Sequence, residues 1–162
     1  QVLVTGTRMS LEPLETAEGA DHFACRQLSV FLENHVGQLL RVTRLLEPEP
    51  IRILGLSLEG KVDCAVLRLL VDDPDLAYDV CSRAGLAVTQ SELIVVELPP
   101  AKTGVRTVCM GLLSGEVNIN YAYTVWATRE VIPCLAIQVD NMPQAVKALS
   151  HNKFRMLSQD EL

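Results

Sequence analysis

The sequence is poor in the features that mark nucleic-acid-binding and membrane-spanning proteins. Aromatic residues make up only 4% of the 162 residues, so few side chains are available to stack on unpaired bases. Lys and Arg number 14 against 20 Asp and Glu, which gives a net charge of −6, and no basic run is present to attract phosphates. No apolar stretch reaches the roughly 18 residues of a transmembrane helix. We therefore expect neither nucleic acid nor a membrane as a partner.

Motifs of common enzyme classes are also missing. The chain contains no GxSxG, P-loop, HExxH or Rossmann glycine pattern. Its three histidines, His22, His35 and His151, fall in predicted arm or loop positions, and its five cysteines form no CxxC pair. The first residues lack the long apolar core of a secretory signal. These observations predict a cytoplasmic, non-catalytic protein with buried free thiols, no metal site and no cofactor.

Regular hydrophobic patterning begins near residue 26. Residues 1–25 are acidic and without a sustained period, and they predict an extended arm. The following segment predicts a strand, a helix, two strands, a helix and a strand. The expected ranges are 27–33, 39–46, 51–58, 62–71, 74–84 and 86–89. The same order of elements returns at 91–98, 104–113, 116–126, 131–139, 142–149 and 154–157.

The two halves of this pattern align at a nearly constant offset. Gly37 and Gly104 are 67 residues apart, and Ala77 and Ala145 are 68 apart. Such regularity indicates an internal duplication. Each βαββαβ unit has the ferredoxin-like order, so the sequence predicts an α+β fold with one unit at 26–90 and a second at 91–162. We expect them side by side, as one eight-stranded antiparallel sheet with four helices on one face.

The first strand-to-helix turn is the most informative segment for function. It reads Asn34-His35-Val36-Gly37-Gln38-Leu39. A helix N-terminus presents unpaired N–H groups and a positive dipole, and Gly37 lets a ligand approach the backbone closely. Asn34 offers a donor and an acceptor, which suits a zwitterion, and it could alternatively cap the helix. The turn thus predicts either an amino acid site or an unliganded capped turn, and from the turn alone the latter is favoured.

Leu32-Glu33-Asn34-x-x-Gly37-x-Leu39, together with the duplicated βαββαβ order, resembles an ACT domain, a small regulatory module that binds amino acids. The resemblance is strongest to the ACT domain of acetolactate synthase small (regulatory) subunits. It implies a ligand held between two units, by residues 34–39 of one and by an asparagine at the second strand of the other. The second role falls on Asn118. Ala101 and Arg52 replace the reciprocal asparagines, so one site per chain is expected, at the interface between the repeats.

The leading hypothesis is a tandem ACT sensor that binds a free amino acid, of the branched-chain class because the surroundings are apolar, and regulates a biosynthetic enzyme. Phe31 lies on the strand face opposite Leu28, Val30 and Leu32, and this predicts that a second chain covers that face in a homodimer. Two alternatives remain. One is a regulatory subunit that requires an acetolactate synthase catalytic partner, and the other is an enzyme in its own right.

Overall fold

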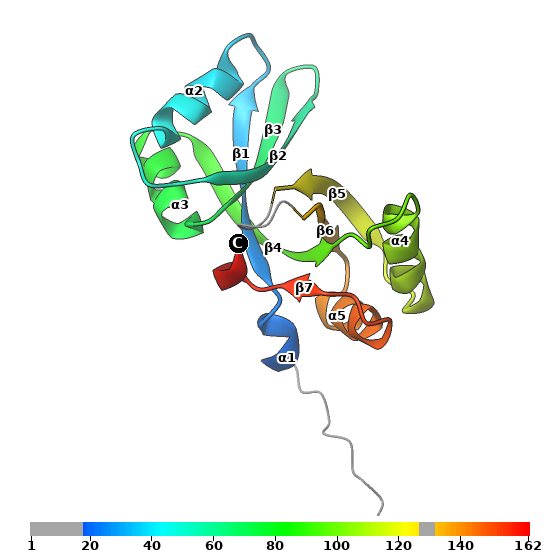
Figure 1. Cartoon of the computed structure of the whole chain (residues 1–162). Coiled ribbons are helices and arrows are strands. Elements are labelled where there is room, and N and C mark those ends of the chain that lie inside the picture. Colours follow the sequence, from blue (N-terminus) through cyan, green and yellow to red (C-terminus); the bar gives the residue numbers. More distant parts are fainter. Residues whose placement is uncertain (1–17, 127–131) are drawn as a thin grey trace, which may run out of the picture.

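The computed structural model of the chain describes residues 18–126 and 132–162 (Figure 1). The elements are α1 (Glu18–Asp21), β1 (Cys25–Glu33), α2 (Gln38–Leu46), β2 (Ile53–Gly60), β3 (Cys64–Val71), α3 (Pro74–Arg83), β4 (Ala87–Glu97), α4 (Gly104–Ser114), β5 (Ile119–Val125), β6 (Cys134–Val139), α5 (Met142–His151), β7 (Met156–Leu157) and a 3-10 turn, η1 (Gln159–Glu161). This order confirms the predicted α+β fold of two βαββαβ units. None of the helices so described is long and apolar enough to cross a membrane.

One antiparallel sheet runs through both units, and β4 joins them. The strand order is β2-β3-β1-β4-β6-β5, with β7 also paired to β4. Residues 87–93 of β4 pair with β1, and residues 94–97 pair with β6. The strands expected at 86–89 and 91–98 are therefore a single strand, because no glycine or proline interrupts the extended chain there. The described sheet has seven strands instead of eight, and the predicted unit boundary at 90/91 falls inside β4.

Each unit packs its own helices on one face of the sheet. In the first unit, Leu28 and Val30 of β1 lie against Val42 of α2 and Ala77 of α3. The second unit buries a corresponding set of side chains from β4, α4 and α5, which includes Ile94, Val96, Val108, Leu112, Ala145 and Leu149. Helix α1 adds Ala20 to this second core. The predicted extended arm is thus helical at Glu18–Asp21, and its residues 1–17 lie outside the described part of the chain.

The sheet curls until its outermost strands, β2 and β5, meet (Figure 1). The backbone N–H of Trp126 donates to the carbonyl of Leu54 at 2.6 Å. A third core fills the inside of the curl and includes Leu54, Leu70, Val95, Tyr123, Val125 and Ala136. Gly55 permits the contact, because a Cβ at this position would overlap the side chain of Val125. The two units therefore share an apolar interface and are not independent beads.

Polar contacts repeat between the units at the predicted offsets. The backbone N–H groups of Arg52 and Asn118, 66 residues apart, donate to Asp72 at 2.8 Å and Asp140 at 3.1 Å. Asp73 caps α3 and Asn141 caps α5, in each case by accepting from the N–H three residues later. A register shift follows Ile53 in the first unit and Ile119 in the second. The duplication thus extends to individual side chains.

Candidate functional site

The β1–α2 turn exposes an uncapped helix N-terminus. Gly37 is the N-cap of α2 with φ 90°, a left-handed conformation that favours glycine. A Cβ at Gly37 would meet nothing within 4 Å, so the space beside the backbone is open. Within the described residues no side chain caps α2, and its first turn carries no acidic residue. The free N–H groups of Gln38 and Leu39, with the helix dipole, make this turn attractive to a carboxylate.

Asn34 fixes the turn to the neighbouring hairpin instead of capping the helix. Its side-chain Nδ2 donates to the backbone carbonyl of Lys61, between β2 and β3. The capping role considered for Asn34 is therefore wrong, because its amide nitrogen points across the unit and Gly37 occupies the N-cap. The Asn34 Oδ1 also lies 3.4 Å from where a Cβ of Gly60 would stand. The bond to Lys61 thus holds the Asn34 side chain in place beside the β2–β3 hairpin.

Exposed side chains form the rim of this turn. His35 Nε2 lies 3.0 Å from Glu33 Oε2 and 2.6 Å from Gln38 Nε2. These two contacts need opposite roles from the ring nitrogen, since a carboxylate accepts and an amide NH2 donates, so the tautomer decides which one forms. Val36 is 100% exposed, while Leu39 is half-buried against the hydrophobic core of the first unit. The rim thus combines one polar cluster with aliphatic surface.

The corresponding turn of the second unit is closed. Ala101 stands where Asn34 would be, and Gly104 is buried. A Cβ at Gly104 would lie 2.8 Å from the carbonyl oxygen of Pro99, so backbone fills the space that is open beside Gly37. Gly104 also lacks the positive φ of Gly37. This difference supports the prediction that only the first turn can receive a ligand.

Asn118 lies in a different part of the molecule. It precedes β5, and its side-chain Nδ2 donates to Asn120 Oδ1 at 3.3 Å. Figure 1 places the start of β5 beside α4, away from the turn between β1 and α2. Residues 34–39 are thus brought together by one turn, but the hydrogen bonds of Asn34 and Asn118 each stay within their own unit. Arg52, the counterpart of Asn118, has its Nε 2.9 Å from Asp72 Oδ2.

The contact between the units depends on Gln27, a residue that the sequence analysis did not select. Gln27 is fully buried, and its Nε2 donates to Ser91 Oγ at 2.9 Å and to the hydroxyl of Tyr121. The hydroxyl of Tyr123 donates to Gln27 Oε1 at 2.7 Å. The guanidinium of Arg68 lies 4.2 Å from the centre of the Tyr121 ring. The available signal was the alternation of β1, which places Gln27 on the same face as Phe31.

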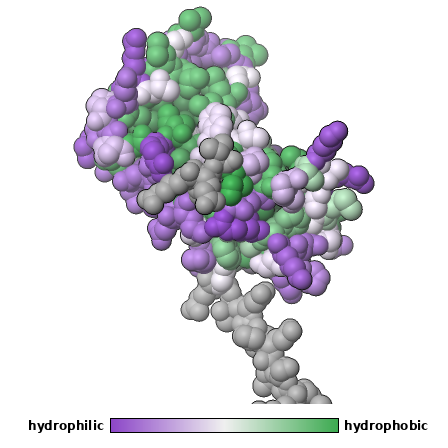
Figure 2. Space-filling view, viewed as in Figure 1, coloured by the Kyte–Doolittle hydropathy of each residue, from purple (hydrophilic) through white to green (hydrophobic). Residues whose placement is uncertain are grey.

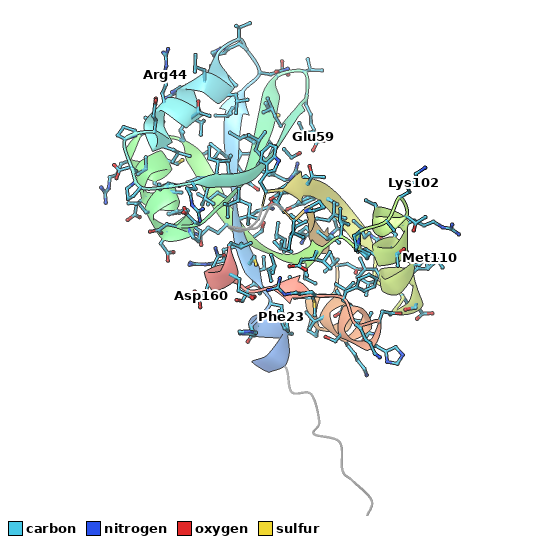
Figure 3. The ribbon with its side chains drawn as sticks, viewed as in Figure 1. Phe23, Arg44, Glu59, Lys102, Met110 and Asp160 are labelled. Atoms are coloured by element: carbon cyan, nitrogen blue, oxygen red, sulfur yellow. The ribbon has the colours of Figure 1, made fainter. Side chains whose placement is uncertain are left out.

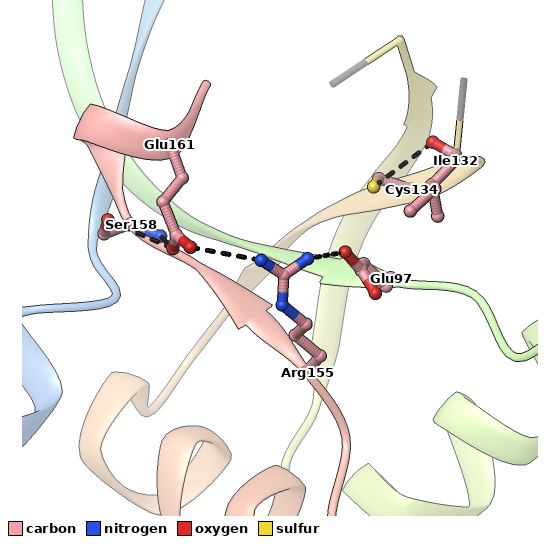
Figure 4. Close-up of polar contacts among 6 residues, drawn as sticks. All are labelled: Glu97, Ile132, Cys134, Arg155, Ser158 and Glu161. Atoms are coloured by element: carbon pink, nitrogen blue, oxygen red, sulfur yellow. Dashed lines mark hydrogen bonds and ion pairs between the residues drawn. The ribbon is translucent and has the colours of Figure 1, made fainter. Parts of the chain in front are cut away.

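An ion-pair cluster ties the C-terminal segment to β4 (Figure 4). Arg155 pairs with Glu97, and its Nη2 lies 3.2 Å from Glu161 Oε1. Glu161 accepts from the backbone N–H of Ser158 at 2.8 Å, and this hydrogen bond chiefly lowers the pKa of its carboxyl. The groups pair with one another across three segments, which indicates a structural role.

The thiols and carboxylates of the described residues do not form a reactive centre. Cys25, Cys81 and Cys134 are buried, and all five cysteines are free thiols. Burial raises the pKa of Cys25 to about 12 and that of Cys134 to about 11, so neither is an activated nucleophile. Residues 18–126 and 132–162 contain no group of three His, Cys, Asp or Glu residues placed to hold a metal ion.

Comparison with known proteins gives a family match over most of the chain. A family model described as an ACT domain pair matches residues 23–162. A solved protein from Bacteroides thetaiotaomicron is 28% identical, covers 86% of this chain and 95% of its own, and has a TM-score of 0.78. The regulatory subunit of aspartate kinase from Thermus thermophilus is 13% identical, with 82% and 94% covered and a TM-score of 0.56. That subunit from Thermus flavus is 10% identical, with 78% and 90% covered and a TM-score of 0.52. No match was found among curated proteins.

Proposed function

Because this chain belongs to the ACT domain pair family, we propose that it is a non-catalytic regulatory protein that binds a free amino acid at the β1–α2 turn. The observation that carries the proposal is the uncapped N-terminus of α2 behind the left-handed, open Gly37. ACT domains are regulatory modules, and the Thermus structures show the same fold in regulatory subunits of aspartate kinase. In the proposal the chain acts in the cytoplasm, where its free thiols would stay reduced.

The ligand would be held by its zwitterionic head. Its carboxylate would accept hydrogen bonds from the N–H groups of residues 36–39, where the dipole of α2 favours negative charge. Its ammonium would donate to Asn34 Oδ1, and His35 would line the rim. Val36 and Leu39 offer aliphatic contacts, which supports a branched-chain amino acid as the guest. Asn118 would contact the ligand only from a second copy, because within one chain it lies just before β5, away from the β1–α2 turn (Figure 1).

Titration calorimetry against the twenty amino acids tests the proposal. The protein would first be unfolded and refolded to strip any bound ligand. We expect one amino acid to bind near one per chain, and Asn34→Ala and Gly37→Ala to abolish or strongly weaken binding. Gly85→Ala is the matched control, because Gly85 also has a positive φ of 75° and an open Cβ position, but lies between α3 and β4. Asn118→Ala tests the second-copy contribution. Unchanged affinity in Gly37→Ala, or no heat with any amino acid, would overturn the site.

A narrower function is regulation of acetolactate synthase. The sequence Leu32-Glu33-Asn34-x-x-Gly37-x-Leu39 favours it, because this motif carries the resemblance to the small subunits of that enzyme. Purified chain would be mixed with an acetolactate synthase catalytic subunit, and valine inhibition would be measured with and without it. Sensitivity conferred by the wild-type chain and lost in Asn34→Ala supports this function. If the chain bound an amino acid but had no effect on the enzyme, the proposed amino acid site would stand and acetolactate synthase would be excluded as its partner.

A further inference from the structure

Helix α4 has an unpartnered apolar outer face. Val105, Met110 and Leu113 are 49%, 56% and 74% exposed, and Cys109 is exposed beside them. Figure 3 shows Met110 projecting from α4, and in Figure 2 the surface over α4 mixes hydrophobic with charged residues. Among the large hydrophobic side chains of the described helices, α2 exposes only Leu40 and α3 only Tyr78. The outer face of α4 therefore exposes more large hydrophobic side chains than any other helix described, although Arg106 and Thr107 are also exposed on it.

The exposed residues form a stripe with a centre of symmetry. Val105, Cys109 and Leu113 recur every four residues, so they lie along one side of a helix about 16 Å long. Cys109 is the middle residue of Gly104–Ser114. Exposed charges of opposite sign stand just beyond the two ends, Lys102 before the helix and Glu116 after it. Lys102 and Glu116 are equally distant from Cys109 along the chain, as are Val105 and Leu113.

We propose that a second copy of this chain docks on this face, with the two α4 helices antiparallel about a two-fold axis at Cys109. In that register Val105 packs against the partner's Leu113, and Lys102 lies beside the partner's Glu116. A two-fold interface must be self-complementary, and in this register apolar residues face apolar residues while Lys102 faces the opposite charge of Glu116. A partner of another sequence would not need charges of opposite sign placed symmetrically about the centre of the stripe.

The size of the helix determines how tight this dimer is. A stable interface typically covers about 800 Å² on each partner, which is more than an 11-residue helix alone supplies. We therefore expect the fraction of dimer to depend on protein concentration, and the interface to include residues that flank α4. The inference goes beyond the proposed function and does not rest on amino acid binding. The two can fail separately, because sedimentation without ligand tests the dimer and calorimetry tests the site.

Sedimentation velocity over the micromolar to millimolar range, without amino acid, tests the surface. Wild-type protein should pass from monomer to dimer, and Leu113→Glu should raise the dissociation constant at least about tenfold. Lys102→Glu should weaken the dimer, and the double variant Lys102→Glu/Glu116→Lys should restore it, which a merely structural defect would not do. Phe31→Glu is the control on the other candidate surface, since Phe31 is 45% exposed on β1. Circular dichroism would confirm that each variant is folded.

Cross-linking locates the two-fold axis. In a Cys64→Ser background, Cys109 is the one exposed cysteine of the described residues, since Cys25, Cys81 and Cys134 are buried. A short bis-maleimide should then join two chains, and Cys109→Ser should remove the product. The proposal is overturned if the wild type stays monomeric at all concentrations or if Leu113→Glu leaves the dimer intact. Dissociation by Phe31→Glu alone would move the interface to the face of β1.

Discussion

Gly55→Ala tests whether the two units close through direct contact between β2 and β5. The added Cβ would overlap the side chain of Val125 and lie 3.2 Å from the backbone oxygen of Thr124. Because Thr124 belongs to the strand backbone, the methyl group cannot be accommodated by a rotamer change alone. Overpacking of this kind costs about 1–3 kcal/mol. At about 2–4 °C per kcal/mol for a chain of this size, the melting temperature should fall by roughly 2–12 °C.

Thermal unfolding by circular dichroism measures this loss, and amide hydrogen exchange locates it. The Trp126 amide, which donates to Leu54 across the closure, should exchange faster in Gly55→Ala. Gly19→Ala is the control, because a Cβ there meets nothing within 4 Å and alanine suits α1. If Gly55→Ala melts within about 1 °C of the wild type and protects Trp126 equally, the strands do not pack as described.

The remaining predictions concern the buried side chain of Gln27, the loss of stability at low pH and the reactivity of the cysteine thiols. Gln27→Ala should destabilise the chain by about 1–3 kcal/mol for each hydroxyl left unsatisfied, measured by urea unfolding, whereas Gln90→Ala on the exposed part of β4 should be nearly neutral. Burial alone would raise the pKa of Asp72, but hydrogen bonds from Arg52 outweigh it and lower that pKa, so this carboxylate stabilises the fold above its unfolded pKa and less as the pH falls through the folded value. The Asp72→Asn variant should therefore be less stable than the wild type at neutral pH, and its stability should fall less below about pH 4. If the stability of the variant and of the wild type fell equally at low pH, the contact between Asp72 and Arg52 would be contradicted. Cys64 and Cys109 should react with a thiol reagent in the native protein, while Cys25, Cys81 and Cys134 should react only on unfolding. Rapid reaction of Cys25 would contradict its burial.

Much of the fold was predictable because its determinants are local. Alternation around Leu28 and Val30 predicted β1, and Asp73-Pro74 and Asn141-Met142-Pro143 predicted the starts of α3 and α5. The constant offset between the halves predicted two like units. The count of strands was wrong because Thr89–Ser91 was interpreted as a connection. A chain without turn residues simply continued as β4.

The candidate site also has features that the sequence predicts locally and features that depend on tertiary packing. The turn at residues 34–39 was predictable, because Gly37 and the following apolar pattern mark a helix start, and the structure adds that the turn is open and uncapped. The bond from Asn34 to Lys61 was not predictable, because it joins residues 27 positions apart through the packing of a hairpin. The position of Asn118 just before β5, away from this turn (Figure 1), depends on how the strands of the two units are arranged, and no local pattern contains that information.

The sequence by itself determined the class of elements, their duplication and the position of the glycine turn, since hydrophobic period, caps and turn residues act over a few neighbouring positions. Only the tertiary structure decided that the sheet curls until β2 meets β5, and that Gln27 is buried between Tyr123 and Ser91. It also decided that Gly37 faces open space whereas Gly104 faces the carbonyl of Pro99. These outcomes depend on contacts between distant segments, which are brought together by the pairing of β4 with both units and by the packing of the shared core.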